Sequence, residues 1–122
     1  MEKGETDGSA KKRLFWDKQN LTSLDGIEKY SRVLTKFSAA DNNITSLKPL
    51  IHCVQLKKLF VSYNKNLKSL RGMESLTNLT HLCFDNCRIE SLKPLVNCTK
   101  LLHVDAHSND IKSLDGMINC SD

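Results

Sequence analysis

The chain repeats one short motif at an almost constant interval. In its clearest form the motif reads Asn-Asn-Ile-Thr-Ser-Leu over residues 42–47, and three later copies and one weaker earlier copy follow the same pattern. A fixed period of 22 or 23 residues predicts a solenoid, in which each repeat forms one turn and buries its apolar side only against its neighbours. The central apolar residues of the five copies are Leu21, Ile44, Leu67, Ile89 and Ile111.

Each repeat begins with an apolar pattern that is typical of a short strand. The pattern Leu-x-x-Leu-x-Leu-x-x-Asn-x-Ile places two apolar residues two positions apart, so that alternate side chains share one face. Stacked turns would pair these strands side by side into a parallel sheet. The buried strand positions are expected at Phe37 and Ala39, Leu59 and Val61, Leu82 and Phe84, and Val104 and Ala106.

An asparagine recurs in the turn after the strand, at Asn42, Asn64 and Asn109. Such a turn leaves backbone N–H and C=O groups pointing inward, where they need hydrogen-bond partners. A primary amide supplies both donors and an acceptor, so the stacked asparagines are expected to bridge successive turns. Cys87 takes this place in one repeat as a weaker member, and one extra residue, Lys65, follows Asn64.

The second half of each repeat places apolar residues three, six and nine positions after the central apolar residue. A spacing of three favours a tight 3₁₀ turn over a long α-helix. Glycine and proline alternate five positions after the central residue, and both residue types discourage a longer helix. These residues are Gly26, Pro49, Gly72, Pro94 and Gly116.

Together these motifs make the chain resemble the leucine-rich repeat family, and within it the short 22-residue class typified by the nuclear regulatory subunit of protein phosphatase 1. The resemblance covers about residues 14–120. It implies an α/β fold: a right-handed leucine-rich repeat solenoid with short parallel β-strands on the concave face and 3₁₀ or short helical turns on the convex face. Residues 1–13 are expected to form a disordered polar tail, and residues 14–122 a domain with a partial first turn, about four full repeats and a truncated last turn.

The composition narrows the class of protein. A net charge of +4 with interleaved acidic residues does not favour nucleic-acid binding. No apolar run is long enough for a transmembrane helix, and residues 1–13 lack the apolar stretch of a secretory signal. We therefore expect a cytoplasmic or nuclear location without a membrane partner. The five cysteines fit a reducing compartment, with Cys53, Cys98 and Cys120 in one core column.

Both ends of the predicted solenoid depart from the repeat. In the partial first turn, Trp16 is expected to cover the edge of the core as a cap. At the other end the sequence stops halfway through a turn, which leaves Ile111, Leu114 and Met117 uncovered. The sequence favours a fragment of a longer protein, and a covering partner or self-association is the alternative.

Residues between the buried strand positions are expected on the concave face, the usual binding surface of such solenoids. Phe15 and Phe60 should be exposed there, and Lys58 and Tyr63 lie beside Phe60. Exposed aromatic residues beside cations are typical of interface hot spots, whereas the alternative is a scattered surface phenylalanine. A basic first half and a mixed acidic and histidine second half would orient a partner. The residues predicted to bind a protein partner are Lys36, Lys58, Phe60, Tyr63, His81, Cys83, Asp85, His103, Asp105 and His107.

Four residues of this face raise the alternative of a metal site. His81, Cys83, His103 and Asp105 fall on neighbouring strands, which lie about 4.8 Å apart in a sheet, close enough to share a zinc ion. The competing interpretation is a hydrated polar surface whose charge responds to pH. Because no sequence-local ligand motif accompanies these residues, we predict neither a metal nor a cofactor.

The sequence contains no catalytic motif that we recognise. It has no Gly-rich phosphate loop, no His-Glu-x-x-His and no nucleophile elbow. One serine recurs in every repeat at an equivalent place, where local backbone hydrogen bonding suits it better than catalysis. These serines are Ser23, Ser46, Ser69, Ser91 and Ser113.

The sequence therefore predicts a non-catalytic protein–protein interaction module that binds a protein partner on its concave face. The resemblance implies a phosphatase-regulatory or scaffolding role, with a phosphatase catalytic subunit as the partner. Two alternatives remain open. One is a metal- or pH-responsive binding module built on His81 and His103, and the other is an N-terminal targeting domain of a longer protein.

Overall fold

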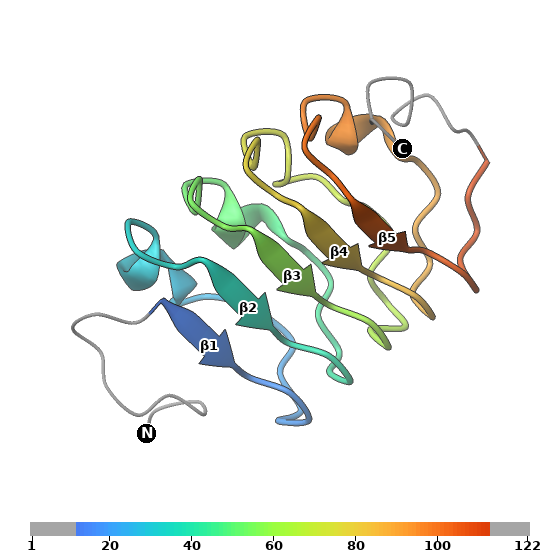
Figure 1. Cartoon of the computed structure of the whole chain (residues 1–122). Coiled ribbons are helices and arrows are strands. Elements are labelled where there is room, and N and C mark those ends of the chain that lie inside the picture. The colour runs from blue at the N-terminus through green and yellow to red at the C-terminus, as the bar shows by residue number, and fades with distance from the viewer. Residues whose placement is uncertain (1–11, 113–122) are drawn as a thin grey trace.

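The computed structural model describes residues 12–112, which form a stack of turns around a five-stranded parallel sheet. The strands lie side by side in the order of the sequence, and a return segment leads from each strand to the next (Figure 1). This arrangement is the solenoid that the repeat period predicts. The strands are β1 (Arg13–Phe15), β2 (Lys36–Ser38), β3 (Lys58–Phe60), β4 (His81–Cys83) and β5 (His103–Asp105).

Alternation along the strands divides their side chains between the core and one open face of the sheet. The middle residue of each strand and the residue just after the strand point into the core, as the period of two requires. The first and third residues of each strand point to the opposite side, which we call the open face. The predicted core positions are buried from Phe37 to Phe84, whereas Val104 and Ala106 are partly buried.

The asparagine column bridges successive turns, as predicted. Asn64 is fully buried, its Oδ1 accepts a hydrogen bond from the N–H of Ile44 at 2.9 Å, and its Nδ2 donates to the carbonyl of Ala39 at 3.1 Å. Asn42 and Asn109 make equivalent bonds to the turns that precede them. Each amide therefore satisfies backbone groups that would otherwise be buried without partners.

Two irregularities of this column compensate each other. Cys87 has no side-chain carbonyl, so it cannot accept the bond that the asparagines accept from the preceding turn; its thiol instead donates to the carbonyl of Val61 at 3.3 Å. The donor in the preceding turn is the N–H of Leu67, which bonds to the carbonyl of Asn64 at 3.0 Å. The extra residue Lys65 makes this local bond possible, because it sets the three-residue separation of a β-turn.

The return segments contain the predicted 3₁₀ turns, namely η1 (Ile27–Tyr30), η2 (Lys48–Leu50) and η3 (Lys93–Leu95). Pro49 and Pro94 lie in the first turn of η2 and η3, where a missing N–H is tolerated. Gly72 occupies the corresponding place between these two repeats with a φ of 111°, and a Cβ there would lie 2.3 Å from the carbonyl oxygen of Leu47. Glycine is therefore required at this close approach of two turns.

The first turn joins the sheet, since β1 pairs with β2 along its whole length and includes Arg13, the last residue of the predicted tail. Trp16 is 3% exposed and meets the ring of Phe37 edge to face at 5.2 Å, which places it over the core as expected of a cap. Within residues 12–112, no helix is long and apolar enough to cross a membrane. Residues 1–11 of the tail and, at the other end, Ser113, Leu114, Gly116, Met117 and Cys120 lie outside the described residues.

Candidate functional site

Two rows of side chains run across the strands on the open face. Because the strands pair in register, each row collects the same position from every strand and brings together residues 22 or 23 positions apart in the sequence. These are the rows that the repeat predicts. The first consists of Arg13, Lys36, Lys58, His81 and His103. The second consists of Phe15, Ser38, Phe60, Cys83 and Asp105.

Phe15, Lys36 and Phe60 form what we call the aromatic–lysine cluster. The Nζ of Lys36 lies 5.5 Å from the ring centroid of Phe15 and 5.8 Å from that of Phe60, so cation–π attraction holds the amine between the two rings. Lys58, the cation predicted beside Phe60, is the first residue of β3 and shares the open face with Phe60, but the cation over the ring is Lys36. Ser38 separates the two phenylalanines in the second row, and its small side chain leaves room above it for Lys36.

The aromatic residues of this half differ in exposure. Phe15 is 46% exposed and Tyr63 is 52% exposed, whereas Phe60 is half-buried and so less exposed than the sequence predicts. The reason is the position in the sheet. Phe60 belongs to the central strand β3 and has neighbours on both sides, whereas Phe15 belongs to the edge strand β1.

The row just beyond the strands has a backbone feature that the sequence analysis missed. Its members share a left-handed conformation with φ between 55° and 60°, which is unusual for a residue as large as tyrosine. The N–H of Tyr63 donates to the carbonyl of Asp85 at 2.9 Å, so the next turn helps to hold this conformation. Asparagine and aspartate tolerate it best, and their presence in the column was the available signal. The row consists of Lys18, Asp41, Tyr63, Asn86 and Ser108.

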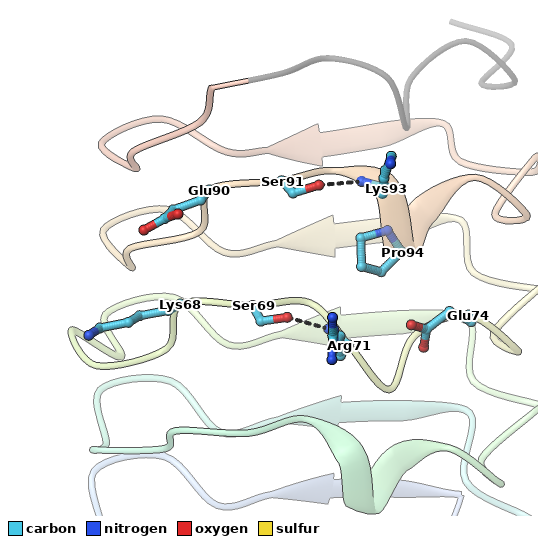
Figure 2. Close-up of a pocket in the computed structure, with 8 residues that line it drawn as sticks. All are labelled: Lys68, Ser69, Arg71, Glu74, Glu90, Ser91, Lys93 and Pro94. Carbon is cyan, nitrogen blue, oxygen red and sulfur yellow. Dashed lines mark hydrogen bonds between the residues drawn. The ribbon is translucent and has the colours of Figure 1, made fainter.

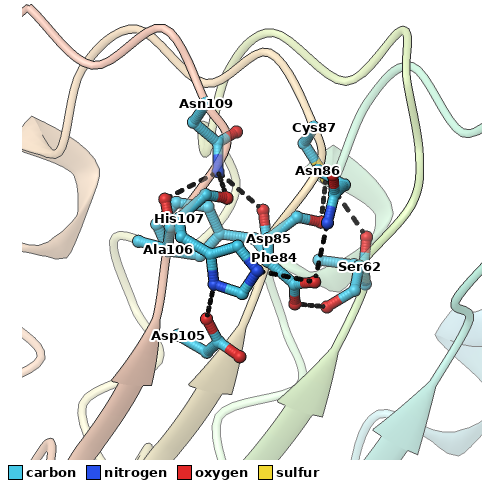
Figure 3. A network of polar contacts seen from close by, with 10 residues as sticks. Ser62, Phe84, Asp85, Asn86, Cys87, Asp105, Ala106, His107 and Asn109 are labelled. Atoms are coloured by element: carbon cyan, nitrogen blue, oxygen red, sulfur yellow. Dashed lines mark hydrogen bonds and ion pairs between the residues drawn. The ribbon is translucent and has the colours of Figure 1, made fainter.

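The last two strands lead into a polar network that Figure 3 shows, and we call Asp85, Asp105 and His107 the acid–histidine cluster. The Nδ1 of His107 lies 2.6 Å from the Oδ1 of Asp105, and its Nε2 lies 3.7 Å from the Oδ2 of Asp85. Asp85 is 8% exposed. Its Oδ1 accepts a hydrogen bond from the Oγ of Ser62, and its Oδ2 accepts one from the Nδ2 of Asn86 at 3.1 Å.

The surroundings shift the pKa values of two groups on β4 and its turn. Burial raises the pKa of Asp85, but the hydrogen bonds from Ser62 and Asn86 lower it, and the net result is a pKa below the ordinary value. For Cys83, burial raises the pKa of the thiol, and the carboxylates of Asp105 and Asp85 raise it further. Near neutral pH, Asp85 is therefore a carboxylate, and Cys83 is a thiol with little thiolate character.

The residues that could hold a metal ion differ from those that the sequence raised as an alternative zinc site. The donor atoms of the acid–histidine cluster all lie within 4.8 Å of one another, and they form the one such group of three in the part of the chain that is described. The zinc group that the sequence raised as an alternative, His81, Cys83, His103 and Asp105, is not such a group among the described residues. The rings of the two histidines stack with their centroids 5.9 Å apart, and the Nδ1 of His81 lies 2.9 Å from the Oγ1 of Thr80.

A hollow of about 550 Å³ lies away from the open face, between two neighbouring return segments (Figure 2). The Oγ atoms of Ser69 and Ser91 accept hydrogen bonds from the N–H groups of Arg71 and Lys93 at 3.0 and 3.1 Å, the local role predicted for the serine column. None of the described lining residues is a histidine that could activate these serines. The lining consists of Lys68, Ser69, Arg71, Glu74, Glu90, Ser91, Lys93 and Pro94.

Comparison with known proteins adds structural relatives. No family model matches the sequence, and no curated protein matches it either. Among solved structures, the chain is similar to an internalin from Listeria monocytogenes, with a TM-score of 0.83 and 26% identity over 88% of this chain. It is also similar to an internalin C2 from the same bacterium, with a TM-score of 0.65 and 18% identity over 88% of this chain.

The chain covers 32% of the first internalin and 66% of the second. Internalins are leucine-rich repeat proteins, so these neighbours support the predicted family at the level of the fold. They give no support to the short phosphatase-regulatory class. The register, the buried columns and these neighbours together identify the fold as a leucine-rich repeat solenoid that is similar to the fold of internalins.

Proposed function

We propose that this chain is a non-catalytic interaction module that binds a protein partner on the open face of its sheet. Leucine-rich repeat solenoids commonly bind proteins through such extended faces. In this proposal the open face is the concave side of a right-handed solenoid. The proposed contact residues are the exposed ring of Phe15 and the residues predicted from the sequence, namely Lys36, Lys58, Phe60, Tyr63, His81, Cys83, Asp85, His103, Asp105 and His107.

The observation that carries the proposal is the aromatic–lysine cluster. Phe15 is 46% exposed beside the amine of Lys36, on a surface where the repeat needs no apolar side chain. Tyr63 adds a second exposed ring at the end of β3. Aromatic rings beside a cation supply both apolar area and an oriented charge, which is the combination found at the centres of protein interfaces.

The other end of the face has the opposite chemistry. The acid–histidine cluster places two carboxylates beside the end of β5, whereas β1, β2 and β3 begin with cations. Opposite charges at the two ends of one surface orient a partner of complementary charge, and they raise its association rate more than they raise its affinity. We therefore expect changes at Lys36 and Lys58 to act mainly on the association rate.

Affinity purification from lysate of the source cells, with mass spectrometry of the co-purifying proteins, tests this function. Wild type is compared with Phe60→Ala and Phe15→Ala, and Ile51→Ala serves as the control, because Ile51 is a 45% exposed apolar residue in a return segment. Each open-face change should weaken binding of the purified partner by about 1–3 kcal/mol, whereas the control should not. A partner that binds both open-face variants as firmly as wild type would show that the face is not the binding surface.

The same purification tests whether the partner is a phosphatase catalytic subunit. A phosphatase catalytic subunit among the retained proteins would support the phosphatase-regulatory role that the sequence resemblance implies. A different retained partner would remove that role and leave the interaction module intact. The cytoplasmic or nuclear location and a targeting role in a longer protein remain predictions.

A metal- or pH-responsive module is the second candidate, and the acid–histidine cluster is the observation that favours it. With its donor atoms within 4.8 Å of one another, His107 and Asp85 could both bind a zinc ion while Asp105 orients the His107 ring. Calorimetric titration with zinc chloride should then show saturable binding that His107→Ala abolishes. Equal heats for wild type and His107→Ala would reject the candidate.

A further inference from the structure

Three cations stand side by side where the first three strands begin, and we call Arg13, Lys36 and Lys58 the cation row. They are Cα partners in the parallel register of β1, β2 and β3. Neighbouring strands lie about 4.8 Å apart, and like charges opposite each other destabilise a sheet. Repulsion between these cations therefore destabilises the fold when no ligand is bound, and an anionic ligand would relieve that repulsion.

No carboxylate of the described chain neutralises the cation row. The ion pairs within residues 12–112 belong to the acid–histidine cluster and to Lys112 with Glu90. Asp17 lies four residues beyond Arg13, and its Oδ1 accepts hydrogen bonds from the Oγ of Ser38 at 2.7 Å and the N–H of Ala40 at 2.8 Å. The positive charge of the row is thus available to a ligand.

The cation row adjoins exposed aromatic surface and further positive charge. The rings of Phe15 and Phe60 flank the amine of Lys36 and keep part of the water away from it, which strengthens an ion pair with an incoming anion. Two further exposed lysines lie just before these strands, Lys12 before β1 and Lys57 before β3. A ligand that fits this surface has several negative groups along the row and an apolar side chain beside them.

We propose that the cation row binds an acidic peptide segment of the protein partner, with carboxylates on Arg13, Lys36 and Lys58 and an aromatic or aliphatic side chain against Phe15. The assignment rests on the proposed function, because it specifies the chemistry of a partner at the same face. Nucleic acid fits less well, since the row spans only about 10 Å and the acid–histidine cluster on the same face repels a longer phosphate backbone.

Fluorescence anisotropy with a labelled synthetic peptide, Gly-Glu-Glu-Phe-Glu-Glu-Gly, tests the proposal directly. The comparison probes are the same peptide with Gln for every Glu, the same peptide with Ala for Phe, and a short oligothymidylate. The row-neutral protein carries Arg13→Gln, Lys36→Gln and Lys58→Gln. The control protein carries Lys48→Gln, Lys68→Gln and Lys93→Gln, which remove the same charge from exposed positions of the return segments.

Wild type should bind the Glu peptide at least about tenfold more tightly than the Gln peptide, and the Ala peptide should bind more weakly than the Phe peptide. The row-neutral protein should lose about tenfold in affinity, whereas the control protein should keep most of it. The row-neutral protein should also unfold at about the same temperature, because the loss of repulsion between neighbouring cations offsets the loss of the cation–π contacts of Lys36. A loss of binding through misfolding would instead lower the unfolding temperature.

Equal binding of the Glu and Gln peptides, an equal loss in the control protein, or tighter binding of the oligothymidylate overturns the proposal. Binding of the partner isolated from lysate to the row-neutral protein and to Phe60→Ala distinguishes failure of the acidic-segment proposal from failure of the proposed function. A partner that the row-neutral protein retains but Phe60→Ala loses preserves the open-face function and overturns the acidic segment. A partner that both proteins retain overturns the open-face function itself.

Discussion

The first three strands and the last two share one backbone geometry but present different chemistry on the open face. β1 to β3 carry cations and two phenylalanines, and β4 and β5 carry stacked histidines, a thiol and a carboxylate. The register is continuous across the boundary, where Leu59 of β3 pairs with Leu82 of β4. The buried columns therefore set the geometry of the sheet, and the side chains of the open face vary independently of it.

The two halves also differ beneath the surface, in how the turns are joined. Asn42 and Asn64 form a buried amide ladder in the first half, with a β-bridge between them. Cys87 interrupts the ladder at the start of the second half, and only its thiol contributes a hydrogen bond. The first half should thus depend more strongly on side-chain amides for its stability.

The largest expected effect tests this difference in the ladder. Asn64→Ala should lower the free energy of unfolding by about 3 kcal/mol or more, because it leaves the N–H of Ile44 and the carbonyls of Ala39 and Val61 without this partner. Cys87→Ala should lower it by about 1 kcal/mol at most. Urea unfolding followed by circular dichroism measures both changes. Equal losses in the two variants would mean that the amide ladder is not the distinguishing support of the first half.

A smaller effect concerns acid stability, which should depend on the second half. The pKa of Asp85 is lowered in the folded state, so its stabilising contribution is present above the unfolded pKa, near 3.9, and is lost as the pH falls through the folded pKa. At neutral pH, Asp85→Asn should lower the free energy of unfolding by about 1 kcal/mol, through weaker hydrogen bonds from Ser62 and Asn86.

Urea midpoints measured between pH 2 and pH 7 check this expectation. Wild type should lose more stability below about pH 4 than Asp85→Asn does, because the variant has no carboxylate to protonate. Asp41→Asn, a change at an exposed aspartate in the first half, is the matched control. If Asp85→Asn and wild type lose stability in parallel on acidification, the carboxylate of Asp85 is not responsible.

The smallest effect concerns the thiol that faces the carboxylates. Burial raises the pKa of Cys83 most and the carboxylate of Asp105 raises it further, so Asp105→Asn should increase the alkylation rate of Cys83 by iodoacetamide at pH 8, by about twofold. Site-resolved mass spectrometry gives the rate. Cys53 is the internal control, since it is buried and its pKa is raised to about 11, mainly by desolvation and further by Glu28. A rate for Cys83 that Asp105→Asn leaves unchanged would contradict the assigned cause.

The sequence was sufficient to predict the strands, the rows and the asparagine ladder, because each follows from a periodic requirement for burial or for hydrogen bonding. Phe37 and Leu59 must be apolar if the turns stack, and Asn64 must satisfy buried backbone groups. The period also predicted which strand residues would become neighbours on the open face. These inferences needed only the number of residues in each turn.

The details of the site could not be predicted in the same way. The choice of Lys36 over Lys58 as the cation between the rings depends on side-chain conformations, about which the period carries no information. The left-handed backbone of Tyr63 is imposed by the neighbouring turns and runs against the preference of its own residue type. His107 lies between the carboxylates of Asp85 and Asp105 because of the orientation of its ring, and the sequence does not specify that orientation.

The compensation between Lys65 and Cys87 bears on how such a chain can be rearranged by recombination. A repeat that carries cysteine at this place requires an elongated loop in the repeat before it. Cysteine supplies no acceptor for the N–H of Leu67, so the acceptor must come from the same repeat as Leu67, where it is the carbonyl of Asn64. A consensus copy in place of the repeat with Lys65 would leave this N–H facing Cys87 without an acceptor. A consensus copy in place of the repeat with Cys87 would bring an amide oxygen whose donor, the N–H of Leu67, is already bonded to Asn64. In this part of the chain the exchangeable unit is therefore a pair of adjacent repeats. Exchange of a single repeat would leave an unsatisfied hydrogen-bonding group where the two repeats meet.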